Sequence, residues 1–174
     1  RTVDTPRRDG WMGEGPNSDL SALSSGLTWV GPVPFRIAEG ASGGREACVV
    51  LADSTTPAGL YPEAVFDIPV GMAAGKLYFL HTCSVPAFRD RDLYATGNPG
   101  TLGRYEVNYA DGSQVSIPLR YQATVDDWNS QRGPAQAIGR WQAKTADGAL
   151  ATLAAIEWRN PRPEVTVVSI DFVS

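Results

Sequence analysis

The sequence has little of what most catalytic and metal centres need. Its 174 residues contain one histidine and two cysteines, and the histidine, His81, lies inside an apolar run. Structural zinc takes four Cys or His ligands, so this supply argues against a zinc site. The sequence also lacks the hydrolase nucleophile elbow, the phosphate-binding loop, the dinucleotide-binding fingerprint and the paired-histidine zinc helix. We therefore expect a domain that is not itself an enzyme, with His81 as a packed, hydrogen-bonded core residue.

Positive charge and long apolar stretches are scarce as well. Lys76 and Lys144 are the only lysines, and the formal net charge is −4. An acidic surface of this kind repels polyanions, and the basic cluster Arg159–Arg162 is too small to change that. No stretch is long enough to cross a bilayer as a helix. We therefore expect neither a nucleic-acid partner nor a membrane partner.

Glycine, proline and tryptophan are well represented instead, with 18, 13 and 5 residues. This mixture suits an extracellular β domain, and the length allows one domain with a sizeable core. Without a linker or an internal repeat, residues 1–174 are expected to form that single domain. The chain begins at Arg1, so we expect a mature product or a module of a larger protein that is secreted to the periplasm or the cell exterior.

A β-hairpin is the clearest local signal, and it spans Gly103–Leu119. Apolar residues alternate with polar ones on both sides of Asp111-Gly112, namely Tyr105, Val107 and Tyr109, then Val115, Ile117 and Leu119. A three-residue loop, Ala110–Gly112, sets Val107 opposite Val115 and places both apolar rows on one face. Such a loop is a type I turn followed by a left-handed Gly112 and a glycine bulge.

Short strand-like segments recur along the rest of the chain, with turn residues between them. The expected strands are Arg1–Thr5, Leu27–Val30, Val33–Ala38, Cys48–Leu51, Ala64–Val70, Lys76–Cys83, Gln136–Ala143, Leu150–Trp158 and Glu164–Val173. The apolar runs Cys48–Leu51 and Lys76–Cys83 predict central, covered strands, and the last strand should turn Val168, Ile170 and Phe172 to the core. The pattern predicts an all-β fold, an antiparallel two-sheet β-sandwich of jelly-roll type.

The two cysteines and the carboxylates each allow more than one interpretation. We interpret Cys48 and Cys83 as buried free thiols, with a disulfide as the alternative. Asp126-Asp127 are adjacent in a loop, whereas glycosidase chemistry needs two carboxyl groups that face each other across a sugar. A glycine-broken loop carries Asp4, Asp9, Glu14, Asn17 and Asp19. Its oxygens suit structural calcium, and a polar loop with Asx turns is the equal alternative.

Aromatic residues on loops are the candidates for sugar binding, because a sugar ring stacks on an aromatic face while planar polar groups bind its hydroxyls. The candidate ligand-binding residues are Trp11, Phe88, Arg89, Arg91, Tyr94, Asp127, Trp128 and Trp141. The alternative for each aromatic is a plug that closes an end of the sandwich, and we favour it for Trp11 and Trp128. Trp29 and Trp158 are assigned to the core.

Several segments together resemble a known family. They are GWMGEGPNSDL, GPVPFRI, LYFLHTC, YEVNYADGSQVSIPL, DDW and EWRNPRPEVTVVSIDFVS, in this order along nearly the whole chain. They are similar to galactose-binding-like β-sandwich domains that are appended to bacterial polysaccharide-degrading enzymes.

The resemblance implies a jelly roll in a secreted multidomain protein, a polysaccharide or oligosaccharide ligand, and a catalytic domain in the same parent chain. The matching residues are mostly turn and core types, namely Gly112, Pro118, Trp158, Asn160, Pro161 and Asp171. The excursion Pro86–Leu102 lies outside the matching segments, so specificity is expected there. The long polar connection Tyr121–Pro134, on the other side of the hairpin, is the second place where we expect a site. We expect a non-catalytic carbohydrate-binding module; the alternatives are a structural domain that packs against a catalytic neighbour, and a carbohydrate-active enzyme.

Overall fold

The computed structural model describes residues 17, 20–39, 48–52, 59–85 and 100–174. Within these ranges the chain forms nine strands and no helix, and every strand pairing within the sheets is antiparallel. The all-β, antiparallel fold class predicted from the sequence is thereby confirmed. In the described part of the chain, no helix has the length and apolar character to cross a membrane.

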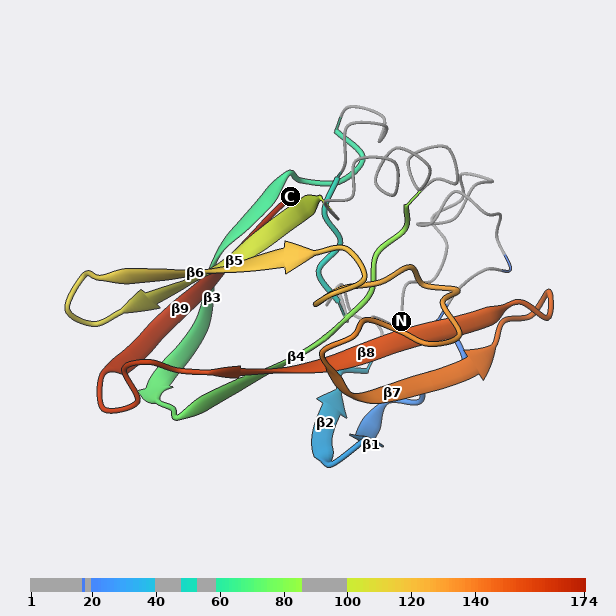
Figure 1. The fold of residues 1–174 in the computed structure, drawn as a ribbon, viewed down its shortest axis with the longest axis horizontal. Coiled ribbons are helices and arrows are strands. Elements are labelled where there is room, and N and C mark those ends of the chain that lie inside the picture. The colour runs from blue at the N-terminus through green and yellow to red at the C-terminus, as the bar shows by residue number, and fades with distance from the viewer. Residues whose placement is uncertain (1–16, 18–19, 40–47, 53–58, 86–99) are drawn as a thin grey trace.

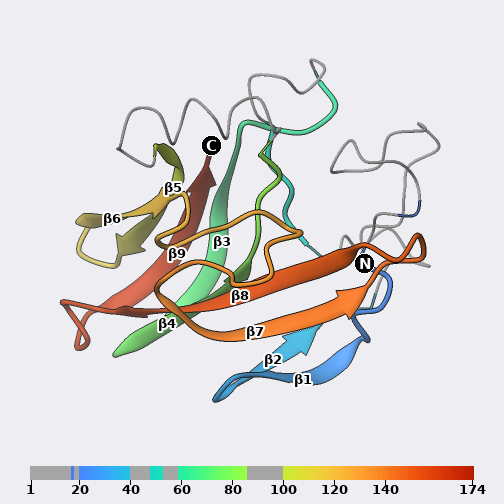
Figure 2. The same cartoon turned by 45° about the vertical axis from the view of Figure 1, so that its right-hand side comes forward.

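Four strands form the largest sheet, in the order β3-β9-β5-β6. They are β3 (Ala64–Ala73), β9 (Thr166–Val173), β5 (Thr101–Tyr109) and β6 (Gln114–Arg120). Three strands form the second sheet, in the order β4-β8-β7. They are β4 (Lys76–His81), β8 (Leu150–Arg159) and β7 (Ala137–Lys144). A separate hairpin, β1 (Gly26–Val30) and β2 (Val33–Ile37), lies beside β7 (Figure 2).

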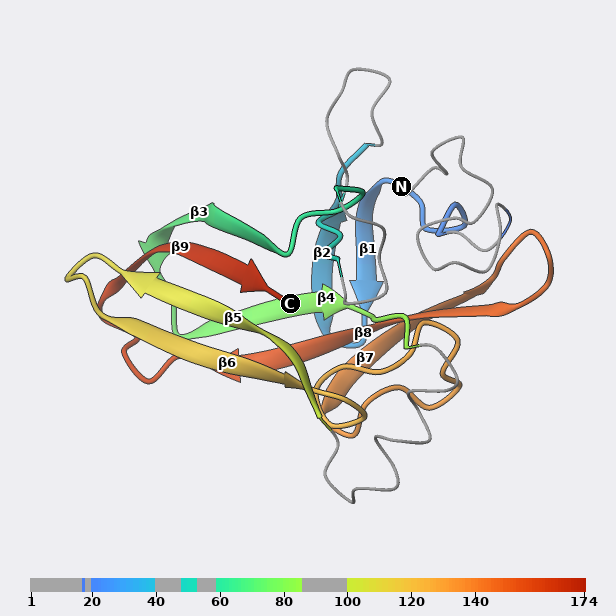
Figure 3. The same cartoon turned by 90° about the horizontal axis from the view of Figure 1, so that it is seen from above.

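The apolar core joins the two larger sheets, whose strands lie across from each other in Figures 1 and 3. Phe79 of β4 stacks on Tyr105 of β5 with ring centroids 4.1 Å apart. Trp158 of β8 packs against a cluster that contains Val107 of β5 and Val167 of β9. Because side chains from one sheet complete the apolar clusters of the other, the assignment of Trp158 to the core is confirmed.

The predicted hairpin register is also confirmed. Tyr105 lies opposite Ile117 and Val107 opposite Val115. The Gly112 amide donates to the Tyr109 carbonyl, which closes the turn, and Gly112 has a φ of 81°. A residue at this φ is strained unless it lacks a Cβ, which is why the loop needs glycine here.

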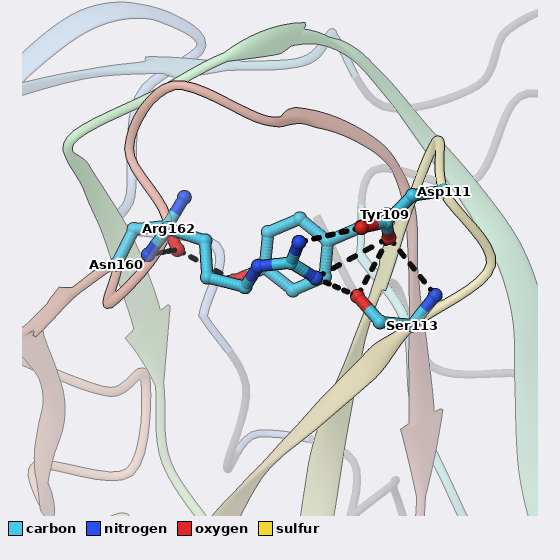
Figure 4. Close-up of polar contacts among 5 residues, drawn as sticks. All are labelled: Tyr109, Asp111, Ser113, Asn160 and Arg162. Atoms are coloured by element: carbon cyan, nitrogen blue, oxygen red, sulfur yellow. Dashed lines mark hydrogen bonds and ion pairs between the residues drawn. The ribbon is translucent and has the colours of Figure 1, made fainter.

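A polar cluster holds this hairpin loop against the β8–β9 connection (Figure 4). The Tyr109 hydroxyl donates to Asn160 Oδ1 over 2.5 Å, and the Asn160 side chain also donates to the Ala74 carbonyl. Arg162 lies over the Tyr109 ring and pairs with Asp111. This ion pair keeps the pKa of the Asp111 carboxyl well below its usual range. The turn at Asn160 thus fastens two loops together.

Two strand predictions are wrong. Residues 48–52 form no strand, so Cys48–Leu51 is not a central strand. An apolar run predicts burial, but pairing also needs a partner strand, and the run alone does not supply one. Lys76–His81 is a strand but an edge strand that pairs only with β8, so Tyr78 is exposed rather than fully covered.

The orientation of one β9 side chain and the burial of both cysteines also differ from the predictions. Val168 is exposed while Val167 is buried, because a register shift between β5 and β9 pairs Val167 with Tyr109. One extra residue in a strand exchanges which of its faces points to the core. Beyond the register shift, Ile170 and Phe172 pack inward as predicted. Neither Cys48 nor Cys83 forms a disulfide within the described residues, as interpreted, but Cys48 is exposed and Cys83 is only partly buried.

Candidate functional site

Most of the residues proposed for binding lie outside the described residues. These are Trp11, Phe88, Arg89, Arg91 and Tyr94 from the sugar-binding set, and Asp4, Asp9 and Asp19 from the calcium set. Asn17 is described and lies exposed in a turn. Among the described residues, no group of three or more His, Cys, Asp or Glu side chains is placed to hold a metal ion.

Trp128 and Trp141 meet in one apolar cluster instead of forming an open platform. Trp128 is 4% exposed and packs with Leu20, Ala151 and Leu153. Trp141 is half-buried against the same cluster. The Trp128 carbonyl accepts the Thr152 amide proton over 2.6 Å, so this segment continues beside β8 where β4 has ended. The position of Trp128 agrees with a plug, because its buried ring has no face left for a sugar.

Asp126 and Asp127 have different surroundings although they are adjacent. Both carboxylate oxygens of Asp126 are occupied, one by the Asp127 amide and one by the Ser130 hydroxyl. Asp127 accepts the Val85 amide proton through Oδ2, while its Oδ1 is buried without a hydrogen-bond partner. Desolvation raises the pKa of Asp127 to about 6, partly offset by backbone amides such as that of Val85. The two carboxyl groups therefore do not form a facing pair across a sugar-sized gap.

His81 is a hydrogen-bonded packing residue, as predicted. Its Nε2 lies 2.8 Å from the Thr124 carbonyl, which only accepts, so Nε2 carries the proton. Its Nδ1 therefore accepts the Tyr105 hydroxyl proton over 3.0 Å. Burial lowers the pKa of His81 to about 4, so the ring is neutral at pH 7. Burial also raises the pKa of the nearby Cys83 thiol well above its ordinary value, which leaves it a weak nucleophile.

An exposed aromatic face lies on the β1–β2 hairpin, and sequence reasoning missed it. Trp29, assigned to the core, is 64% exposed, and Leu27 is exposed to the same extent. The register sets Trp29 opposite Pro34 and Leu27 opposite Arg36. Side chains two apart on a strand and opposite across a pair share one face. These four residues, Leu27, Trp29, Pro34 and Arg36, are called the Trp29 face below.

The opposite face of this hairpin fixes its position. Val30 and Val33 are buried, and the loop between them, Gly31-Pro32, has Gly31 at a φ of 59°. A Cβ on Gly31 would lie 2.5 Å from the Ile138 carbonyl oxygen, and one on Gly139 would lie 2.5 Å from the Gly31 nitrogen. The hairpin is therefore seated on β7 by direct backbone contact, with the Trp29 face turned outward.

A polar cleft begins where this hairpin meets β7. It has a volume of about 1080 Å³, and Gly31 lies in its wall. The wall also contains residues of the loop 122–135 and of β7, including Gln122, Asp126, Arg132, Arg140 and Gln142. The long connection Tyr121–Pro134, predicted from its length and polarity as a place to look for a site, thus forms much of this cleft.

Comparisons of the chain with protein-family models, with curated proteins and with solved structures find no match. The resemblance to galactose-binding-like domains therefore stays a prediction from the residues.

Proposed function

We propose that this domain is a non-catalytic carbohydrate-binding module, with the Trp29 face as its contact surface for a polysaccharide. The observation that carries the proposal is that Trp29 is 64% exposed, on the hairpin face that it shares with Leu27 and Pro34. A large aromatic ring left in water at this extent costs free energy that a stacked sugar ring recovers. The expected parent protein is secreted and carries a polysaccharide-degrading catalytic domain.

Trp29 is held in a way that suits a binding platform. The inward residues Val30 and Val33 are buried, and the Gly31–Gly139 backbone contact fixes the hairpin on β7. The indole therefore projects from an ordered strand, and binding a sugar orders little that was free before. Arg36, across from Leu27, offers planar N–H donors to sugar hydroxyls beside the ring.

The test is to titrate the 174-residue chain against plant and algal polysaccharides by affinity electrophoresis and calorimetry. We expect Trp29→Ala to weaken binding about tenfold or more, since losing roughly 1.4 kcal/mol of stacking is a tenfold change. Phe66→Ala is the matched control, because Phe66 on β3 is also 64% exposed but lies on another sheet. Equal affinities for Trp29→Ala and the parent chain would overturn the platform.

A second function, a structural domain that packs against a catalytic neighbour, has its own supporting observation. The edge strand β3 exposes Phe66 and Met72, and Val168 is exposed on the adjacent β9. Exposed large apolar side chains on neighbouring strands are typical of a surface covered by another protein domain. If Phe66→Ala and Met72→Ser abolish association with the separately produced catalytic domain while Trp29→Ala does not, this second function is favoured.

A further inference from the structure

The polar cleft beside the hairpin carries two arginines that have no carboxylate partner among the described residues. Arg132 and Arg140 both line it, and neither takes part in an ion pair of the described chain. This is unusual for a chain whose net charge is −4, where acidic groups outnumber basic ones. Both guanidinium groups are strong, permanently charged donors suited to carboxylate or sulfate.

Arg140 is positioned by its surroundings. Its guanidinium donates to the Arg132 carbonyl, and its aliphatic stem lies over Gly133, where a Cβ would meet the Arg140 Cδ at 3.0 Å. Gly133 also has a φ of 67°, so the loop needs glycine there for two reasons. A guanidinium has five N–H donors, and one is engaged within the described chain. The remaining donors are available to a ligand at little conformational cost.

The loop that carries Arg132 is fastened to β7 and β8 by the residues around it. Gln142 Nε2 donates to the Gln131 carbonyl over 3.1 Å, and the Thr152 hydroxyl donates to the Ser130 carbonyl over 2.8 Å. The Ser130 hydroxyl in turn donates to Asp126 and accepts the Gly133 amide proton. These bonds hold the loop against β7 and β8, so Arg132 and Arg140 line the same cleft in fixed positions.

Asp126 is the one acidic residue in the lining, and its carboxylate is hydrogen-bonded within the loop. Both of its oxygens accept hydrogen bonds from the loop, from the Asp127 amide over 2.9 Å and from the Ser130 hydroxyl over 2.7 Å. It is also buried, at 9% exposure, whereas Arg132 and Arg140 are exposed. The open part of the cleft therefore presents positive charge and amide groups.

We propose that this cleft is an anion-binding subsite that takes the carboxylate or sulfate group of an acidic polysaccharide. Naming the ligand as a polysaccharide rests on the proposed function, and the anion preference rests on the cleft alone. Gly31 lies in the cleft wall and belongs to the hairpin that carries Trp29, so the cleft and the Trp29 face share this hairpin. The net charge excludes a broad basic surface, so recognition of the anion is local to these two arginines.

The polymer test uses pairs of polysaccharides that differ only in charge. Polygalacturonate is compared with its methyl ester, and carrageenan with its desulfated form, by calorimetry on the 174-residue chain. We expect the double variant, Arg132→Gln with Arg140→Gln, to bind the charged member about tenfold or more weaker. Its affinity for the neutral member should change less than about twofold. Arg120→Gln is the matched control, since Arg120 is exposed and outside the cleft lining.

Three variants keep the test interpretable if the double variant unfolds. Arg132→Gln alone removes a side chain that forms no ion pair within the described residues, and Arg140→Lys keeps the charge but loses the planar fork. Gly133→Ala should crowd the Arg140 stem and weaken only the charged ligands. Far-ultraviolet circular dichroism and urea unfolding identify any variant whose loss of binding is a loss of fold.

A second readout separates the two proposals. Backbone amide signals of Gly133 and Gly139 are followed by NMR during addition of galacturonate, galactose 6-sulfate or galactose. Shifts with the charged sugars alone support the subsite, even if no polysaccharide binds and the proposed function fails. If polysaccharides bind but charged and neutral members bind equally and neither charged sugar shifts these signals, the subsite is overturned while the proposed function stands. A response to only one anion identifies it as carboxylated or sulfated.

Discussion

The hairpins β1–β2 and β5–β6 are built alike, but they turn their large aromatic residues in opposite directions. Each has alternating strands, and each has a glycine at positive φ in its loop, Gly31 in one and Gly112 in the other. The β5–β6 hairpin turns its aromatic row inward, and Tyr105 is 7% exposed. The β1–β2 hairpin turns its tryptophan outward and fills its inner face with valines. One hairpin therefore contributes its aromatic row to the core, while the other leaves its tryptophan exposed on the surface.

The difference shows what decides the role of an alternating strand. Alternation specifies which residues share a face, but the packing of neighbouring elements decides which face is inward. Val107 lies in a cluster against which Leu77 and Trp158 of the second sheet pack, and those side chains cover it. In β1–β2 the close backbone approach at Gly139 draws the valine face toward β7 and leaves Trp29 outside.

The largest effect should come from truncating one aromatic on each hairpin. Tyr105→Ala should lower the free energy of unfolding by about 3–5 kcal/mol, because it removes a stacked core ring. Trp29→Ala should change it by about 0.5 kcal/mol or less, because the ring is in water. Urea unfolding measures both, and Tyr105→Phe serves if Tyr105→Ala does not fold. A large loss for Trp29→Ala would remove the distinction between the hairpins.

The two loop glycines should also differ. Gly112→Ala meets no atom within 4 Å, so it should cost only the left-handed conformation, about 1–2 kcal/mol. Gly31→Ala has the same strain and a Cβ 2.5 Å from the Ile138 carbonyl, so we expect about 3–4 kcal/mol. The difference in urea midpoints measures the backbone contact. Equal losses would mean that the hairpin is not seated on β7 as described.

Acid should act on the inward hairpin through His81, which bonds Tyr105. The folded pKa of His81 is about 4 against an ordinary 6.5, so its contribution to stability falls as pH drops through this window. The folded pKa of Asp127 is about 6 against 3.8, so its contribution falls as pH rises through nearly the same window. These two slopes oppose each other.

We therefore expect a nearly flat stability profile between pH 4 and 6.5 for these two groups. Asp127→Asn should reveal the histidine slope, with stability rising by about 3 kcal/mol as pH rises across the window. Urea unfolding at several pH values measures it. Glu63→Gln, at an exposed carboxylate, is the control and should leave the profile of the parent chain unchanged.

The smallest effect should come from the exposed ion pair between Arg162 and Asp111 on the inward hairpin. Asp111→Asn should lower the melting temperature slightly, and 1 M NaCl should remove the difference because salt screens exposed pairs. The pKa of Asp111 is lowered in the fold, so this contribution is present above the ordinary Asp range and fades as pH falls below it. A salt-independent loss would assign the role to the hydrogen bonds with Ser113 instead.

Local chemistry made the scaffold predictable, while the site depends on distant packing. The Asp111-Gly112 loop sets the register of β5–β6 within a few residues, so sequence reasoning placed Val107 opposite Val115. Trp29 was misassigned because both rows of its hairpin are apolar, and only the contact with Gly139 selects between them. The Val168 error has a similar origin, since a bulge opposite β5 leaves no signature in the strand itself.

The cleft arginines could not have been recognised from sequence. Arg132 lies in a loop and Arg140 on the next strand, and nothing in either segment says that the loop folds back across β7. The one usable signal was the length and polarity of residues 121–134, which did indicate a region of interest. Gly133 packs against the Arg140 stem, a contact between positions seven residues apart that no local pattern indicates.

The backbone contact between Gly31 and Gly139 has a consequence for protein engineering. The hairpin is anchored by its loop and its valine face, so the four exposed positions 27, 29, 34 and 36 are not needed to hold it in place. They form a small randomisable surface on a fixed support. A library varied at these four positions, with Gly31 and Gly139 kept, should yield folded domains that differ only in this surface.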